Sequence, residues 1–184
     1  MLAALEKPAI RDRMAPMTIG MYHDLVKAGS IENDVEFLEG VLIEKMPKSP
    51  MHEYLTKQLF KLLLNLVPAG YEVNKEAPIT IGNSEPEPDI SIVKGVASDF
   101  KDRHPTTAEL IIEVAISSED LDFEKANIYA QAAIPLYIIV HGESKKATLF
   151  SNPSSGKYGS KIEVTEKIDL PFMGKTLSLS ELFN

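Results

Sequence analysis

Two carboxylates near the middle of the chain occupy positions that suit a metal ion. Asp89 opens the apolar segment DISIV at 89–93, and Glu113 lies within LIIEVAI at 110–116. Side chains alternate between the two faces of a strand, so each carboxylate is expected opposite an apolar face. Mg²⁺ is commonly held by one or two carboxylates while it keeps several waters and contacts a substrate phosphate. If the two strands are neighbours, Asp89 and Glu113 can form a metal site.

The alternative is that both carboxylates face solvent on a half-exposed sheet. A buried, ionised carboxylate is costly unless it is paired or binds a cation. Lys125 follows Glu113 by 12 residues, about one turn into a predicted helix. A loop-to-helix return would bring its ammonium over the end of the strand, where it could orient a nucleophile or offset charge on a scissile phosphate. The other interpretation of Lys125 is a solvated position on the helix surface.

The composition limits the class of protein. The chain has 184 residues, of which 44% are hydrophobic and 25% charged, which is typical of a globular protein. The absence of cysteine excludes disulfides, thiolate zinc sites and cysteine nucleophiles, and it fits the cytoplasm, where we expect the protein. No apolar run approaches the roughly 20 residues of a membrane span, so no membrane partner is expected. A net charge of −8 argues against tight, non-specific coating of DNA.

Hydrophobic patterning predicts the elements that position these side chains. Thr18 caps a helix that ends at Gly29, and a hairpin follows at 35–46. Ser49-Pro50 begins a longer helix, whose apolar stripe consists of Leu55, Leu59, Leu62 and Leu66. A second long helix is predicted at 119–133, and strands at 71–81, 89–93, 110–116, 136–140, 145–150, 161–165 and 175–179. We expect one α+β domain over 1–184, a mixed β-sheet flanked by helices, with a flexible N-terminal segment at 1–16.

The order of these segments resembles a known family. The stretches PEPDISIV and LIIEVAISSEDLDFEKANIYAQAAIPLYIIV, preceded by EFLEGVLIEKMPKSP, are similar to the Uma-two family of endonucleases. That family belongs to the PD-(D/E)XK restriction-endonuclease-like superfamily, and the likeness covers about residues 17–140. The resemblance implies a restriction-endonuclease-like fold with an α/β-type core. It also implies hydrolysis of DNA phosphodiester bonds with Mg²⁺, or with Mn²⁺ in its place.

The superfamily pattern is an acid after a proline, then Glu-X-Lys on the next strand. Pro88-Asp89 and Glu113 match it, whereas Ala115 stands where the lysine is usual. The resemblance implies that the lysine has moved to the following helix, at Lys125. It further implies Asp89 and Glu113 as metal ligands, the backbone carbonyl of Val114 as a third ligand, and Lys125 as the catalytic cation.

Two further residues are candidates for a supporting role. His52 lies in the first turn of its helix, and Glu36 lies in the preceding hairpin, a segment from which such nucleases often draw an acid. The chain departs from the family pattern outside the proposed metal site. Tyr137-Ile138 replaces a Tyr-Trp pair, His141 stands where an aspartate is frequent, and Ala133 stands where a glycine is common.

Other titratable groups are assigned no catalytic role. The acids at the start of the second long helix lack the spacing and glycine of a calcium loop, and stabilisation of the helix start explains them: Glu119, Asp120, Asp122 and Glu124. Glu87, two residues before Asp89, could lie near the metal, but we expect an exposed loop acid. The four histidines show no paired zinc spacing.

Three functions remain open. The first is a Mg²⁺-dependent endonuclease that cuts DNA through metal-activated water. The second is a catalytically inert nuclease fold that serves as a binding or dimerisation module, suggested by the missing Glu-X-Lys lysine and the acidic balance. The third keeps the metal but acts on RNA or a small phosphoester. A homodimer is expected because cutting both strands often uses two active sites, although the sequence shows no interface signature.

Overall fold

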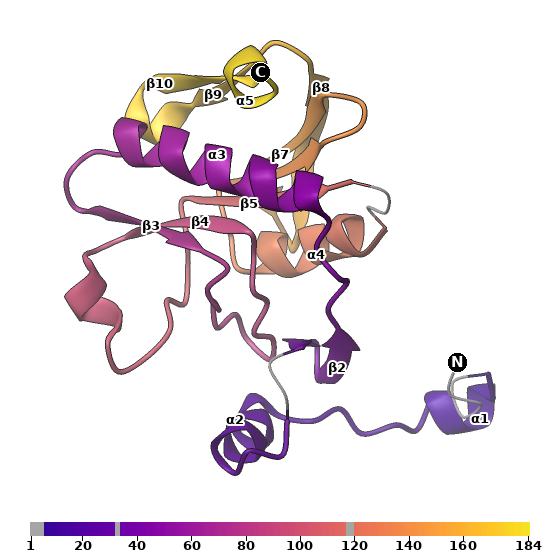
Figure 1. The fold of residues 1–184 in the computed structure, drawn as a ribbon. Helices are drawn as coiled ribbons and strands as arrows, with labels where there is room; N and C mark the ends of the chain where they lie inside the picture. Colours follow the sequence, from indigo (N-terminus) through magenta and orange to yellow (C-terminus); the bar gives the residue numbers. More distant parts are fainter. Residues whose placement is uncertain (1–5, 32–33, 117–119) are drawn as a thin grey trace.

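A six-stranded mixed sheet organises the computed structural model, which describes residues 6–31, 34–116 and 120–184 (Figure 1). The strands lie in the order β3-β4-β5-β6-β7-β8. β5 and β6 are parallel, and the other neighbouring pairs are antiparallel. The bounds are β3 Tyr71–Lys75, β4 Ile90–Lys94, β5 Leu110–Ala115, β6 Leu136–His141, β7 Lys146–Ser154 and β8 Lys157–Val164. This arrangement confirms the predicted α+β class.

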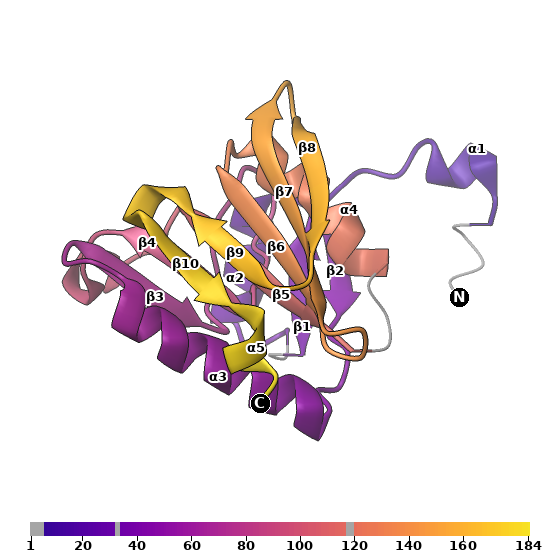
Figure 2. The same cartoon turned by 90° about the horizontal axis from the view of Figure 1, so that it is seen from above.

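Helices cover both faces of the sheet. α3 (Pro50–Leu66) lies on one face and α4 (Asp120–Gln131) on the other (Figure 1). A small unit of β9 (Lys167–Leu170), β10 (Lys175–Ser178) and α5 (Leu179–Leu182) packs beside α3 (Figure 2). Because strand side chains alternate, β5 contributes to both layers of the core. Its Ile112 and Val114 pack in the layer of α3, and its Ile111 and Ala115 in the layer of α4.

The buried stripe of α3 differs from the predicted one. Its helix begins as expected, with the Ser49 hydroxyl accepting a hydrogen bond from the His52 N–H at 3.2 Å. The fully buried leucines, however, are Leu55, Leu59 and Leu63, whereas Leu62 and Leu66 are only partly buried. The sheet and the β9-β10-α5 unit contact α3 from two directions, so the covered face is broader than a single stripe and includes Leu63.

The segment before the sheet approaches the layer of α4. α2 (Ile19–Lys27) is followed by a hairpin of β1 (Val35–Leu38) and β2 (Val41–Glu44), which faces α4 (Figure 1). Tyr22 of α2 stacks on Phe37 of β1, with ring centroids 4.8 Å apart. A short helix, α1 (Pro8–Arg11), precedes them in the segment predicted to be flexible. Residues 1–5 of that segment lie outside the described residues.

The strand predicted at 71–81 ends early. Its sheet pairing stops at Lys75 because Glu76 takes a left-handed backbone conformation, with φ at 50°. The chain then runs beside the hairpin, where the Glu85 N–H donates to the Phe37 carbonyl, and returns to the sheet at Asp89. The other elements missed from the sequence are short: α1, β9, α5 and two single turns of 3-10 helix, Ala97–Phe100 and Pro171–Met173. No helix among the described residues has the length and apolar character to cross a membrane.

Candidate active site

Asp89 and Glu113 meet at the end of the β4-β5 pair. Ile90 lies opposite Ile112 in this antiparallel ladder, which places Asp89 opposite Glu113. The Asp89 N–H donates to Glu113 Oε2 at 3.2 Å, and the Val114 N–H donates to Asp89 Oδ2 at 2.8 Å. Both carboxylates are buried, with exposures of 5% and 4%. The alternative of two solvent-facing acids is therefore wrong, because the layer of α4 and the hairpin covers this face.

Lys125 reaches the carboxylates from α4. Its Nζ lies 3.0 Å from Glu113 Oε1 and 2.8 Å from Glu36 Oε2, and the residue is 5% exposed. The solvated interpretation of this lysine is therefore wrong. Glu36 comes from β1, and its Oε1 also accepts a hydrogen bond from the Glu87 N–H at 2.9 Å. The hairpin thus supplies a second acid for the lysine and fixes the loop that leads into Asp89.

His52 approaches Asp89 from the opposite layer. It lies in the first turn of α3, and its Nε2 is 3.0 Å from Asp89 Oδ2. The hydroxyl of Thr56, one turn further on, lies 3.5 Å from the other ring nitrogen. His52 thereby restrains Asp89 from the α3 side. The structure brings together all of the predicted site residues: Glu36, His52, Asp89, Glu113, Val114 and Lys125.

Three residues at this site were missed from the sequence. Asp122 lines the cavity beside Lys125, and the Tyr129 hydroxyl donates to Glu113 Oε1 at 3.1 Å. Lys48 Nζ lies 3.7 Å from Asp89 Oδ1. Helical spacing could have found the first two, because residues three or four apart share one face of a helix with Lys125. Lys48 comes from an irregular segment before α3, and no periodic pattern marks it.

Two of the predictions about surrounding acids need correction. Asp122 was assigned to the helix start alone, yet its carboxylate belongs to the cavity wall because α4 turns that face toward the sheet. Glu87 is not an exposed loop acid: its side chain is only 25% exposed, pairs with Lys45 Nζ at 3.0 Å, and lines the cavity with Asp89, in line with the alternative position near the metal site. Glu119 lies outside the described residues, so its predicted role is not addressed.

The site contains more acidic than basic side chains. Burial raises the pKa of Glu113 to about 8, although Lys125 acts in the opposite direction. Burial likewise raises the pKa of Asp122 to about 6. For Lys125, burial alone would lower the pKa, but Glu113, Glu36 and Asp122 together raise it, so the lysine stays charged. One buried ammonium is shared among several acids, which leaves room for a further cation.

The donor atoms fit a divalent cation that keeps several of its waters. The cavity here has a volume of about 190 Å³ and is lined by Asp89, Glu113 and Val114. The N–H and C=O of a strand residue point to the same side, so the Val114 carbonyl faces the Asp89 edge, as its N–H does. Among the described residues, no three acidic or histidine side chains form a metal-binding group. An ion here would depend on two carboxylates, a carbonyl and water, a donor set that suits Mg²⁺.

The six-stranded mixed sheet with helices on both faces and paired acids at the end of two adjacent strands is the restriction-endonuclease-like architecture that the sequence resemblance implies. The chain belongs to the Uma2 family, described as "Putative restriction endonuclease", whose sequence model matches residues 22–180. Membership of this family supports a nuclease, in agreement with the resemblance seen in the sequence.

The fold is similar to that of a protein from Anabaena variabilis whose crystal structure is described as that of "a putative nuclease belonging to DUF820". The TM-score is 0.75, and the similarity covers 91% of this chain and 98% of that one. The two sequences are 15% identical, so this likeness shows the fold alone. No curated protein matches the chain.

Proposed function

We propose that the protein is a Mg²⁺-dependent endonuclease that hydrolyses phosphodiester bonds of DNA. The observation that carries this proposal is the convergence of Asp89, Glu113 and Lys125 from two strands and a helix into one buried cluster. Burying a lysine and two acids carries a large desolvation cost, which supports a functional role for this cluster. The Uma2 membership supports the nuclease class, and the donor set supports the choice of metal.

Each side chain has a role in this proposal. Asp89, Glu113 and the Val114 carbonyl would hold the ion, which when bound supplies an activated water and offsets charge on the phosphate. Lys125 stays protonated because its acidic neighbours raise its pKa, so it can stabilise negative charge that develops on the scissile phosphate. Glu36 holds the lysine in place, and His52 holds Asp89.

The rim of the cavity bears on the substrate. Lys45 and Lys48 line the cavity on its outer side, where a phosphate backbone would approach. The net charge of −8 already includes these two lysines, so DNA binding is expected to be weak without a divalent ion. Mn²⁺ is proposed as an alternative ion, and the cytoplasm as the location.

A plasmid assay tests the proposal. Supercoiled plasmid is incubated with Mg²⁺ or Mn²⁺ and with wild type, Asp89→Asn, Glu113→Gln or Lys125→Met. Wild type is expected to produce nicked and linear DNA, and each variant to lose about 100-fold or more in rate. The matched control is Glu143→Gln, because Glu143 is an exposed acid in the turn after β6, outside the cavity. Circular dichroism checks that every variant is folded.

Two results would contradict the proposal. Equal cleavage by wild type and all three site variants would show that these residues do not carry the chemistry. Absence of cleavage, together with no calorimetric Mn²⁺ binding that depends on both carboxylates, would instead indicate the inert binding or dimerisation module. Parallel assays with single-stranded RNA and a small phosphodiester would identify the third function, if either substrate were cut faster than DNA.

A further inference from the structure

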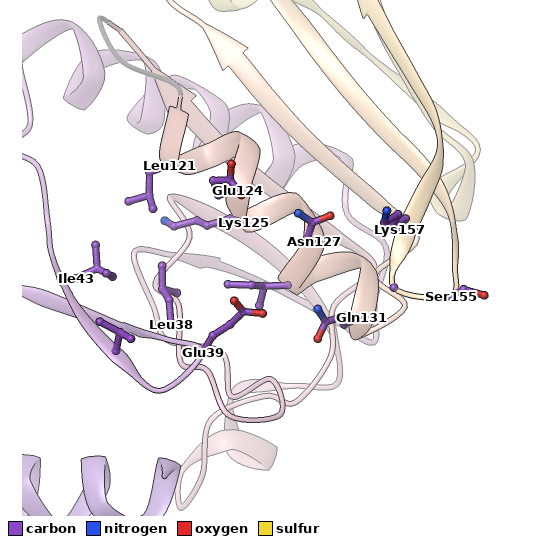
Figure 3. A pocket seen from close by; sticks show the side chains of 13 residues that line it. Leu38, Glu39, Ile43, Leu121, Glu124, Lys125, Asn127, Gln131, Ser155 and Lys157 are labelled. Atoms are coloured by element: carbon purple, nitrogen blue, oxygen red, sulfur yellow. The ribbon is translucent and has the colours of Figure 1, made fainter. Parts of the chain in front are cut away.

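A second and larger cavity lies beside the active site. It has a volume of about 780 Å³, is open to solvent, and is bordered by the β1-β2 hairpin, α4 and the turn between β7 and β8 (Figure 3). We call it the hairpin groove. Its apolar lining comes from Leu38, Val41, Ile43, Leu121 and Ile128, and Val41 is 49% exposed. The groove also shares Leu121 and Lys125 with the active-site cavity.

The charges of the hairpin groove do not suit a nucleic acid. Two exposed acids, Glu39 and Glu124, lie along it, and Lys157 lies at its end by the β7-β8 turn (Figure 3). Lys125 is already paired with the two acids of the active site. A phosphate backbone requires a basic surface, which this groove lacks. An apolar segment with basic neighbours fits the lining better.

The N-terminal arm, residues 6–16, has that character. Every residue of the arm is exposed, and α1 lies apart from the rest of the ribbon in both views (Figures 1 and 2). Ile10 and Met14 are 46% and 50% exposed. Hydrogen bonds from Arg13 N to Ile10 O and from Met14 N to Arg11 O continue the chain as tight turns beyond α1, which keeps these two exposed apolar side chains within a short segment.

The arm is also basic within an acidic chain. From residue 6 to residue 16 it carries Lys7, Arg11 and Arg13 against two acids, Glu6 and Asp12, which gives a local charge of +1 in a chain of −8. The remainder of the chain therefore carries −9. Two bodies of that charge repel each other, whereas a basic arm from one is attracted to the acidic rim of the other.

The arm joins the body of the protein at Pro16 and Met17, at the edge of the hairpin groove. We call this junction the root of the arm. The Met17 N–H donates to the Gly40 carbonyl at 3.0 Å, and Asn83 Nδ2 donates to the Met17 carbonyl at 2.8 Å. Pro16 packs so closely on Gly40 that an added Cβ there would lie 2.4 Å from the proline Cβ. These contacts fix the root to the hairpin turn, while the arm itself leads away from the body.

We propose that two copies of the chain form a dimer by exchanging these arms, each arm lying in the hairpin groove of the other copy. Each root adjoins the groove of its own chain. A two-fold axis near the hairpins would therefore place the groove of each copy within reach of the arm of the other, and the same contact would form twice, as in a closed two-fold dimer. With the four residues of α1 helical and the other seven extended, the arm spans at most about 29 Å, more than the roughly 12 Å of helix from Leu121 to Ile128. This inference does not rest on the proposed nuclease activity.

Cysteine pairing tests the exchange directly, because the chain contains no cysteine of its own. Ile10→Cys protein is mixed with Val41→Cys protein that carries a size tag, and the mixture is mildly oxidised. We expect a disulfide between the two chains to form at least about tenfold faster than with Lys101→Cys in place of Val41→Cys. Lys101 is the matched control because its side chain is 73% exposed and lies outside the groove. Equal rates for the two mixtures would overturn the proposal.

A double variant with Ile10→Cys and Val41→Cys in one chain distinguishes exchange from folding back. At high dilution we expect little disulfide within the monomer. Rapid formation within the monomer, without pairing between chains, would mean that each arm fills its own groove, and this would also overturn the proposal.

Sedimentation velocity over a range of concentrations supplies the second test. Wild type is expected to show a concentration-dependent dimer, and Ile10→Glu with Met14→Glu to weaken its association by about tenfold or more. The control is Ile162→Glu, a change on β8 at a residue of similar exposure, 53%, which is expected to leave association unchanged. A wild type that remains monomeric, or a dimer equally weakened by the control, would refute arm exchange.

Discussion

Replacing Lys125 by methionine should reveal how the buried site balances its charge. Methionine keeps most of the apolar stem but removes the ammonium, which lies 2.8 Å from Glu36 Oε2 and 3.0 Å from Glu113 Oε1. Two buried carboxylates then lose their shared partner. The free energy of unfolding should fall, and the fall should depend on pH because a carboxylate without a cation can take up a proton instead.

The size of the loss follows from burial. Removing one partner of a buried ion pair typically costs about 3–5 kcal/mol, and Lys125 and both acids are less than 7% exposed. The unpaired carboxyl group can avoid this loss by taking up a proton. Keeping that proton costs about 1.4 kcal/mol of folding free energy for each pH unit above the pKa of the group in the unfolded chain, so this cost is the upper limit of the loss at a given pH. We therefore expect a loss of about 1 kcal/mol at pH 5 and about 3 kcal/mol or more at pH 8.

The sign is fixed by proton binding. A buried acid whose pKa is raised on folding binds more protons in the native state than in the unfolded state, between its two pKa values. The free energy of unfolding then decreases as pH rises through that interval. In wild type, Glu113 already causes the free energy of unfolding to decrease with pH. Lys125→Met adds a further decrease, so the difference in unfolding free energy between the two proteins should grow as pH rises.

Urea unfolding followed by circular dichroism at pH 5, 6.5 and 8, without divalent ions, measures the effect. Lys57→Met is the matched control, since Lys57 is an exposed lysine paired with Glu53 on the surface of α3, and it should leave the unfolding midpoint nearly unchanged. Adding Glu36→Gln to Lys125→Met should recover part of the loss, because one of the two unpaired acids is removed. A loss that is equal at pH 5 and pH 8, or below about 1 kcal/mol at pH 8, would refute the reasoning.

Two further predictions use the same unfolding assay. Glu113→Gln should flatten the decrease in stability that wild type shows between the ordinary carboxyl pKa of 4.5 and the raised value of about 8; an unchanged slope would assign that decrease to other groups. Ala133→Gly should raise the free energy of unfolding by about 0.5–1 kcal/mol, because Ala133 is exposed and holds φ at 55°, a conformation that glycine adopts without strain. Ala28→Gly, where φ is −77°, should bring no gain, and an equal gain there would contradict the explanation.

Much of the fold was predictable because its signals are local. Helix caps at Thr18 and Ser49 appear at the predicted residues, since a side-chain oxygen next to a free N–H acts within one turn. Strand alternation correctly placed Glu113 opposite the core face of β5. The short strands β9 and β10 pair with each other, and only β10 was predicted.

The site was only partly predictable because local signals do not show which elements meet around it. Glu113 and Lys125 were found from their order along the chain and from a family resemblance. The roles of Asp122, Glu87 and Lys48 became visible only when α4, the hairpin and the segment before α3 met around the cavity. No local pattern distinguishes an acid that stabilises a helix start from one that lines a site.

The sequence by itself determined the class of fold, the order of the main elements and the identity of the principal site residues. Periodicity and capping act between residues a few positions apart, so they can be read along the chain. Only the tertiary structure decided that the second face of β5 is buried, which turns Glu113 from an exposed acid into a carboxylate with a raised pKa. It also decided that one lysine serves acids from both β1 and β5. Burial and charge pairing depend on which faces meet, and residues far apart in the sequence supply those faces.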